Sequence, residues 1–280
     1  MRALAIAATG MSAQQLNLEV IANNIANINT TGYKSSEATF ADSFSNTLRS
    51  SAPSSGSTSS QSAIQVGTGV QLSSIQTNFS QGALNSTGNI TDLGISGKGF
   101  FIVKDASTGT QFATRDGQFR VDDAGYLVTS GGLRVQGKVG TGIADIKVGA
   151  SLPTGTQLSS VSFDTAGHLI ESYSDGTSAT TAQIQLQNFS DTSGLLREGS
   201  NLFSGLGAAG PIGGGILAGS NDPSTNGLGS IQSGTLESSN VDLTDQFSQL
   251  ITTQRSFQAG SRLITVSDTI LDDIVNLKRS

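Results

Sequence analysis

The stretch ALAIAATGMSAQQLNLEVIANNIANIN, residues 3–29, carries a seven-residue apolar repeat that decides the fold. Two rows of residues recur at this interval, and one row follows the other by three positions. Such spacing is typical of a helix that buries a narrow seam against another helix. We therefore expect a helix from Ala3 to about Asn29. Its seam comprises Leu4, Met11, Leu18, Ile21, Ile25 and Ile28.

A matching repeat occupies the other end of the chain, residues 242–279. At about 1.5 Å per residue this second helix would run about 60 Å, which exceeds the radius of a domain of this size. Asn240 or Asp242 is suited to cap its start. Gly260 lies inside it and predicts a flexible point. The seam on this side comprises Leu243, Phe247, Leu250, Phe257, Ile264 and Leu271.

The outer faces of the first helix are unusual for a helix that faces water. Glu19 is the only charged residue between Ala3 and Tyr33, and the other outer positions are small or carry amides. Such faces suit close packing against further protein, with hydrogen bonds across the contact. We therefore expect the helix to be surrounded by other subunits. The polar residues expected to tie subunits together are Asn23, Asn24, Asn27 and Asn29.

The middle of the chain has a different character. From residue 64 to residue 239 the apolar period is two and glycines are dense, which predicts a β domain. Two hairpins share a D-x-A-G turn, at residues 122–125 and 164–167. Residues 34–63, which include a Ser-rich run, are expected to form a linker or insert. The glycine-rich stretch 206–229 is expected to be a loop.

These observations predict an α+β protein in which long terminal helices pair as an antiparallel coiled coil around a central all-β domain. The helical polymerisation domain would comprise residues 1–33 and 240–280. We expect both helices to leave the β domain at one place. Because isolated helices with one narrow seam are marginally stable, we expect them to order on assembly.

Composition excludes several classes of function. The chain has no cysteine, which rules out thiol catalysis, cysteine metal sites and disulfides. A formal charge of −6 disfavours nucleic acid as a partner. No window reaches the length of a membrane-spanning helix, and the N-terminus is read as mature protein rather than as a signal peptide.

The search for catalytic chemistry finds no complete site. Residues 132–138 match the spacing of a phosphate loop, but Val139 stands where a magnesium-binding hydroxyl is needed. His168 is the only histidine and lies in a hairpin, so a histidine metal cage is excluded. We expect no enzyme activity, no catalytic residue, no cofactor and no metal.

Five segments resemble the axial proteins of the bacterial flagellum. They cover both termini and the first half of the β domain, and they occur in the order typical of the family. The segments are ANNIANINTTGYK (22–34), FSQGALNSTGN (79–89), DLGISGKGFFIV (92–103), TRDGQFRVDDAGYLV (114–128) and ESSNVDLTDQFSQLITTQRSFQAGSRLIT (237–265).

The resemblance implies a subunit of the flagellar rod or hook. Such subunits are exported without a cleaved signal and polymerise into a tube that transmits torque and encloses the export channel. The implied location is the flagellar basal body or hook, from the periplasm to the cell exterior. The implied partners are further copies of the chain, neighbouring rod and hook proteins, and the outer ring proteins that act as a bushing.

The choice within the family stays open between the distal rod and a short hook protein, and the distal rod is favoured. Its stiffening segment would correspond to residues 46–63. A trimeric secreted adhesin or phage-tail-like fibre is the competing class, because it also combines coiled coil with glycine-rich β structure.

Overall fold

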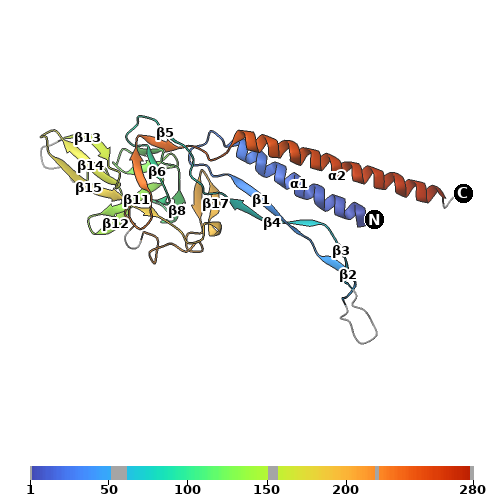
Figure 1. Ribbon diagram of the computed structural model, residues 1–280. Coiled ribbons are helices and arrows are strands. Elements are labelled where there is room, and N and C mark those ends of the chain that lie inside the picture. Colours follow the sequence, from blue (N-terminus) through green and yellow to red (C-terminus); the bar gives the residue numbers. More distant parts are fainter. Residues whose placement is uncertain (1, 52–61, 151–156, 218–220, 278–280) are drawn as a thin grey trace. The chain divides into compact units, whose positions relative to one another are not determined.

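The computed structural model describes residues 2–51, 62–150, 157–217 and 221–277. These residues form two compact units that differ in architecture (Figure 1). The first, here called the helical unit, comprises Met1–Ala26, Ser36–Asn78 and Asp242–Ser280. The second, here called the β unit, comprises Asn27–Ser35 and Phe79–Val241. The α+β class predicted from the sequence is confirmed.

The helical unit contains the two long helices, α1 (Arg2–Ala26) and α2 (Leu243–Leu277). The Asp242 carboxylate caps α2, because its Oδ1 accepts a hydrogen bond of 2.8 Å from the backbone N–H of Thr244. Helix α2 continues through Gly260 without a break. A Cβ atom at this position would lie 2.9 Å from Met11 Cγ, so the glycine allows α1 to approach closely.

Two antiparallel strand pairs complete the helical unit, and they differ from the expected linker. β1 (Ser36–Asp42) pairs with β4 (Val70–Thr77), and β2 (Ser45–Arg49) pairs with β3 (Ile64–Gly67). Helix α1 contacts β1 and β4 as well as α2. The linker prediction missed these strands because β1 and β2 are short and largely polar and because each pairs with a strand that lies further along the chain. Residues 52–61 of the predicted stiffening segment lie outside the described residues.

The β unit is built on one large antiparallel sheet. Its main path has the order β13-β14-β15-β11-β7-β8-β18-β17. Two further pairs, β6 with β19 and β5 with β20, lie outside this sheet. The strands are β5 (Leu84–Ser86), β6 (Leu93–Ser96), β7 (Phe100–Lys104), β8 (Gln111–Thr114), β9 (Phe119–Val121), β10 (Leu127–Thr129), β11 (Arg134–Val139), β12 (Gly142–Asp145), β13 (Leu158–Phe163), β14 (His168–Tyr173), β15 (Ser178–Ile184), β16 (Leu186–Gln187), β17 (Leu196–Gly199), β18 (Leu202–Ser204), β19 (Ser230–Ser233) and β20 (Thr235–Glu237), with a short 3-10 helix at Thr192–Gly194.

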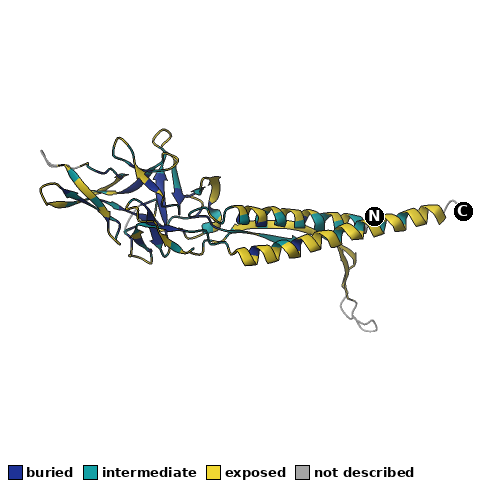
Figure 2. Cartoon of the chain, turned by 90° about the horizontal axis from the view of Figure 1, so that it is seen from above, coloured by how far each residue is buried: buried dark blue, intermediate teal, exposed yellow. Residues whose placement is uncertain are grey.

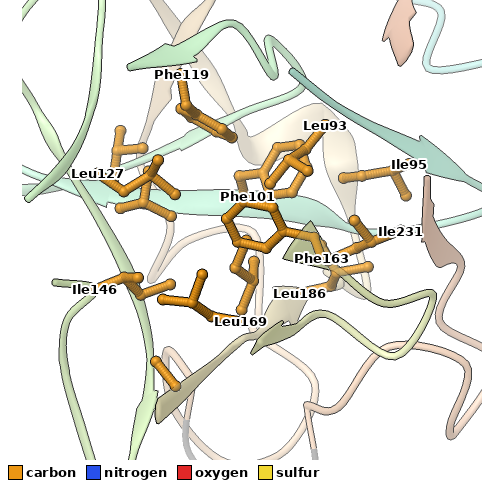
Figure 3. Close-up of a cluster of buried hydrophobic side chains, with 14 of the residues drawn as sticks. Leu93, Ile95, Phe101, Phe119, Leu127, Ile146, Phe163, Leu169, Leu186 and Ile231 are labelled. Atoms are coloured by element: carbon orange, nitrogen blue, oxygen red, sulfur yellow. The ribbon is translucent and has the colours of Figure 1, made fainter. Parts of the chain in front are cut away.

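The core of the β unit surrounds Phe101, whose ring meets Phe119 edge-on at a centroid distance of 5.1 Å. Leu93, Leu127 and Leu169 pack around it with further fully buried side chains (Figure 3). Strand β7 also faces a second apolar cluster through Phe100 and Ile102. Buried residues are concentrated in this unit, whereas both helices carry long exposed faces (Figure 2).

Two local predictions are confirmed at the level of turns. In each D-x-A-G hairpin the glycine N–H bonds to the aspartate carbonyl, at 2.9 Å for Gly125 and 2.8 Å for Gly167. Gly32, in the turn that follows α1, has the left-handed φ of 66°. The expected loop 206–229 contains no strand among its described residues. Its buried Leu206, Ala209 and Leu217 complete the second apolar cluster.

Candidate assembly site

Helices α1 and α2 run antiparallel and meet through polar and small residues. Asn24 Nδ2 donates to Gln246 Oε1 at 3.0 Å, and Asn17 Nδ2 donates to Thr253 Oγ1 at 3.2 Å. The next layer at the same seven-residue interval pairs Gly10 with Gly260, both of which line the groove between the helices. These layers set the register, because each hydrogen bond needs one particular partner.

The apolar residues of the predicted seam lie beside these layers with varied burial. Ile21 is buried in α1, whereas Leu243, Phe247 and Phe257 of α2 are exposed. The single chain therefore leaves much of the seam uncovered. The half-buried members are Leu4, Met11, Leu18, Ile25, Leu250, Ile264 and Leu271, whereas the predicted member Ile28 is half-buried but follows the end of α1 at Ala26 and lies in the β unit.

The four asparagines predicted to tie subunits together have different environments. Asn24 is buried, and its amide is used inside the chain, because it bonds the backbone N–H and C=O of Ser36 as well as Gln246. In the single chain the Asn24 amide therefore holds α1 to β1 and to α2. Asn27 is half-buried and accepts from Thr30 Oγ1, whereas Asn23 and Asn29 are exposed.

The outer half of α2 carries a second apolar face that the sequence reading did not separate from the seam. Its residues follow one another at spacings of three and four, so they share one side of the helix. They are more than half exposed, with 53% for Ile270 and 61% for Leu263. The face comprises Leu263, Val266, Ile270, Ile274 and Leu277.

A buried charged cluster in the β unit ties together the segments that lead to the two helices. Lys34 follows α1 in the chain and Glu237 precedes α2, and Lys34 Nζ lies 2.6 Å from Glu237 Oε1. Arg115 Nη1 donates to Glu237 Oε2 at 3.2 Å. The side chains of Lys34 and Glu237 are 0% exposed.

Two cations thus share one carboxylate inside the protein. Lys34 also donates to the Ser80 carbonyl at 2.8 Å, and the Gly82 N–H donates to Glu237 at 2.9 Å. Burial lowers the pKa of Lys34 below its ordinary value, and its hydrogen bond to Glu237 opposes this effect. Burial likewise lowers the pKa of Arg115. The cluster depends on Glu237 to offset the cost of burying two cations.

The sequence reading assigned no role to Lys34, Arg115 or Glu237, although a signal was present. The five segments that carry the family resemblance converge on this cluster. Lys34 comes from the first, Ser80 and Gly82 from the second, Arg115 from the fourth and Glu237 from the fifth. The third contributes the Gly97 carbonyl, which accepts from Arg115 Nη2 at 2.8 Å.

The comparisons with known proteins agree with these features. Residues 4–34 match the family described as "Flagella basal body rod protein", residues 94–170 match "Flagellar hook protein FlgE/F/G D1 domain", and residues 232–277 match "Flagellar basal body rod FlgEFG protein C-terminal". The "Flagellar basal-body rod protein FlgG" of Bacillus subtilis is 37% identical, with 100% of both chains covered. The chain belongs to the flagellar basal-body rod protein family.

Rod and hook relatives differ in how much of this rod-family chain they match. The rod protein FlgG of Borreliella burgdorferi is 36% identical over 100% of this chain and 99% of its own. The "Flagellar hook protein FlgE" of Helicobacter mustelae is 46% identical, but the match covers 49% of this chain and 30% of the hook protein. Full-length similarity is thus found with rod proteins. The expected flagellar axial family is confirmed.

Two further observations concern the part of the rod-family chain that the structure describes. Neither α1 nor α2 is long and apolar enough to cross a membrane. Among the described residues, no three histidine, cysteine, aspartate or glutamate side chains gather as a group that would hold a metal ion.

Proposed function

We propose that this chain is a structural subunit of the flagellar rod, in its distal part, and that it self-assembles into a tube that transmits torque and encloses the export channel. The full-length similarity to rod proteins supports the rod over the hook. The work of such a subunit is done by packing rather than by catalysis.

The exposed apolar face of α2 is the observation that carries this proposal. In the hydrogen-bonded register, paired residue numbers add up to 270, so Arg2 at the start of α1 falls opposite residue 268. Ile270, Ile274 and Leu277 extend past this point. Exposed apolar patches of this kind mark protein interfaces. Helices of further copies would cover the face and pair with the predicted seam as a coiled coil.

The remaining expectations of the rod assignment follow as part of the proposal. Copies of the chain would be exported across the inner membrane without a cleaved signal and would assemble in the basal body. Their neighbours along the axis would be related rod and hook proteins, with the outer ring proteins around them as a bushing. The terminal helices would order fully only on assembly, because a single chain leaves their seam partly uncovered.

The test is Ile270→Glu, compared with Thr265→Glu on the polar side of the same helix. Both positions are exposed in the single chain, so neither change should alter the unfolding of the β unit. A glutamate at position 270 would place a charge in an apolar contact and should raise the critical concentration for polymers at least tenfold, on the order of 1.4 kcal/mol or more per contact.

Sedimentation and negative-stain electron microscopy measure the polymers, and urea unfolding followed by tyrosine fluorescence reports on the β unit. Polymers of normal yield from Ile270→Glu would contradict the assignment of the face. Loss of polymers in both variants would also contradict it, because the effect would then not depend on which side of α2 carries the charge.

A further inference from the structure

A cavity of about 310 Å³ opens beside the buried charged cluster of the β unit. Arg115 and Lys98 line it, together with Asn188, Ser190 and Thr192. The rings of Phe79, Phe100 and Phe189 supply its apolar walls, with centroid distances of 5.4 Å and 5.6 Å from Phe100 to the other two. Two cations and several hydrogen-bond donors thus face one cavity that no aspartate or glutamate lines among the described residues.

The charge on Arg115 is incompletely matched within the described residues. Arg115 is 5% exposed, and its Nε is a buried donor without a hydrogen-bond partner in that part of the chain. Its other two nitrogens bond Glu237 and the Gly97 carbonyl. Glu237 is already bound by Lys34, so one carboxylate serves two cations. A buried cationic group in this situation is stabilised by any anion that reaches its surroundings.

We propose that this cavity is a receptor for a carboxylate, and that the carboxylate is an aspartate or glutamate side chain of a second copy of this chain. Lys98 is exposed at the cavity and would pair with the incoming carboxylate, beside the positive field of Arg115. The phenylalanine walls would pack on the methylene groups of the acidic side chain. The partner assignment rests on the proposed self-assembly.

Charge complementarity supports a second copy as the occupant. The chain has 21 acidic and 15 basic residues, so its copies carry carboxylates in excess. The cavity gathers two of these basic residues without an acidic one in its lining. The basic cavity of one copy can bind an acidic surface of the next copy. Because these two surfaces differ, each added copy still offers a free cavity or a free acidic surface, and the polymer extends in one direction.

The first experiment tests the site on the full chain, kept dilute and monomeric. Propionate carries a carboxylate on a short aliphatic group, and propionamide is its neutral analogue. Titration with propionate should shift the backbone amide signals of Gly99, Ser190 and Thr192 and the Arg115 Nε–Hε signal in a saturable way in ¹⁵N NMR. Propionamide should not, and Lys98→Gln should lose at least half of the saturable shift. Lys138→Gln, an exposed lysine elsewhere in the β unit, should keep it.

Equal weak shifts with propionate and propionamide, or an unchanged response in Lys98→Gln, would overturn the carboxylate site. Lys98 is exposed, so Lys98→Gln leaves the buried cluster around Arg115 in place and the variant is expected to fold.

The second experiment tests the source of the carboxylate. Lys98→Glu should raise the critical concentration for polymers at least tenfold, while Lys138→Glu should leave it within twofold. If Lys98→Glu forms normal polymers while the wild-type chain shows a saturable propionate shift, the carboxylate site stands. A second copy of the chain is then not its occupant. If the wild-type chain forms no polymers, the proposed self-assembly and this occupant both fall, and the propionate titration still decides the site.

Discussion

The helical unit and the β unit bury their apolar residues in opposite ways. Phe101 in the β unit is 0% exposed and is enclosed by side chains of the same chain. Phe257 in α2 is 36% exposed, although it belongs to the predicted seam. The β unit therefore has a core that one chain completes, whereas the helices leave apolar surface uncovered. In the proposed assembly, folding would depend on the β unit and contacts between chains would depend on the helices.

The largest expected difference between the regions comes from truncating these two phenylalanines. Phe101→Ala should lower the free energy of unfolding of the β unit by about 3–5 kcal/mol, because a large buried ring is replaced by a cavity. Phe257→Ala should lower it by less than about 0.5 kcal/mol and should act on polymer yield instead. Urea unfolding of the dilute chain measures both. A comparable loss of monomer stability in the two variants would contradict the proposed difference between the β unit and the helices.

The charged cluster gives the next contrast, between a buried and a partly exposed ion pair. Glu237→Gln should destabilise the β unit by about 3–5 kcal/mol, because Lys34 and Arg115 lose their shared carboxylate while buried. Asp145→Asn removes the partner of Arg134, whose side chain is 30% exposed, and should cost about 1 kcal/mol or less. Equal effects in urea unfolding would mean that the cluster is no more important than a surface pair.

A smaller effect is expected in the helical unit, where polar layers replace an apolar core. Asn24→Ala should cost about 1–3 kcal/mol of local stability, because the Ser36 N–H and Gln246 lose a buried partner. The exposed Gln254 of α2 provides the control, since Gln254→Ala should change stability by less than about 0.5 kcal/mol. Amide hydrogen exchange of α1 and β1 measures the difference. Equal protection in both variants would contradict the structural role of Asn24.

The smallest effect concerns Gly260. Alanine is favoured over glycine inside a helix by up to about 1 kcal/mol, but here its Cβ would press on Met11. Gly260→Ala should therefore stabilise α2 in both backgrounds, but the gain should be about 0.5 kcal/mol smaller in the wild-type chain than in a chain that already carries Met11→Ala. Helix content followed by circular dichroism during thermal unfolding gives both values. An identical gain in helix stability in the two backgrounds would show that the packing of α1 does not require a glycine at position 260.

Part of this architecture could be predicted from periodicity and turn chemistry. The seven-residue repeat identified the terminal helices, and the D-x-A-G turns identified two hairpins, because these signals are local. Strands β1 and β2 were missed because their pairing with β4 and β3 is long-range and their sequence is polar. The linker assignment of residues 34–63 therefore differs from the structure.

The candidate site shows the same limit. The apolar repeat led to the seam, and Asn24 was predicted to bond between subunits, but hydrogen bonds of Asn17 and Asn24 across the helix pair were not predicted. Lys34, Arg115 and Glu237 each lie in a segment that carries the family resemblance, but the resemblance alone does not predict that their side chains meet, since their positions are separated by most of the chain. Only the folded arrangement brings one carboxylate between two cations.

The layers between α1 and α2 also restrict how these two helices of one chain can align. If α2 slipped by seven residues, Asn24 would face Thr253, Asn17 would face Gly260, and Gln246 would lie past the end of α1. Asn17 and Gln246 would lose their partners, so the slipped pair would be less stable than the native one. The hydrogen-bonded layers therefore favour one alignment each time the helix pair forms.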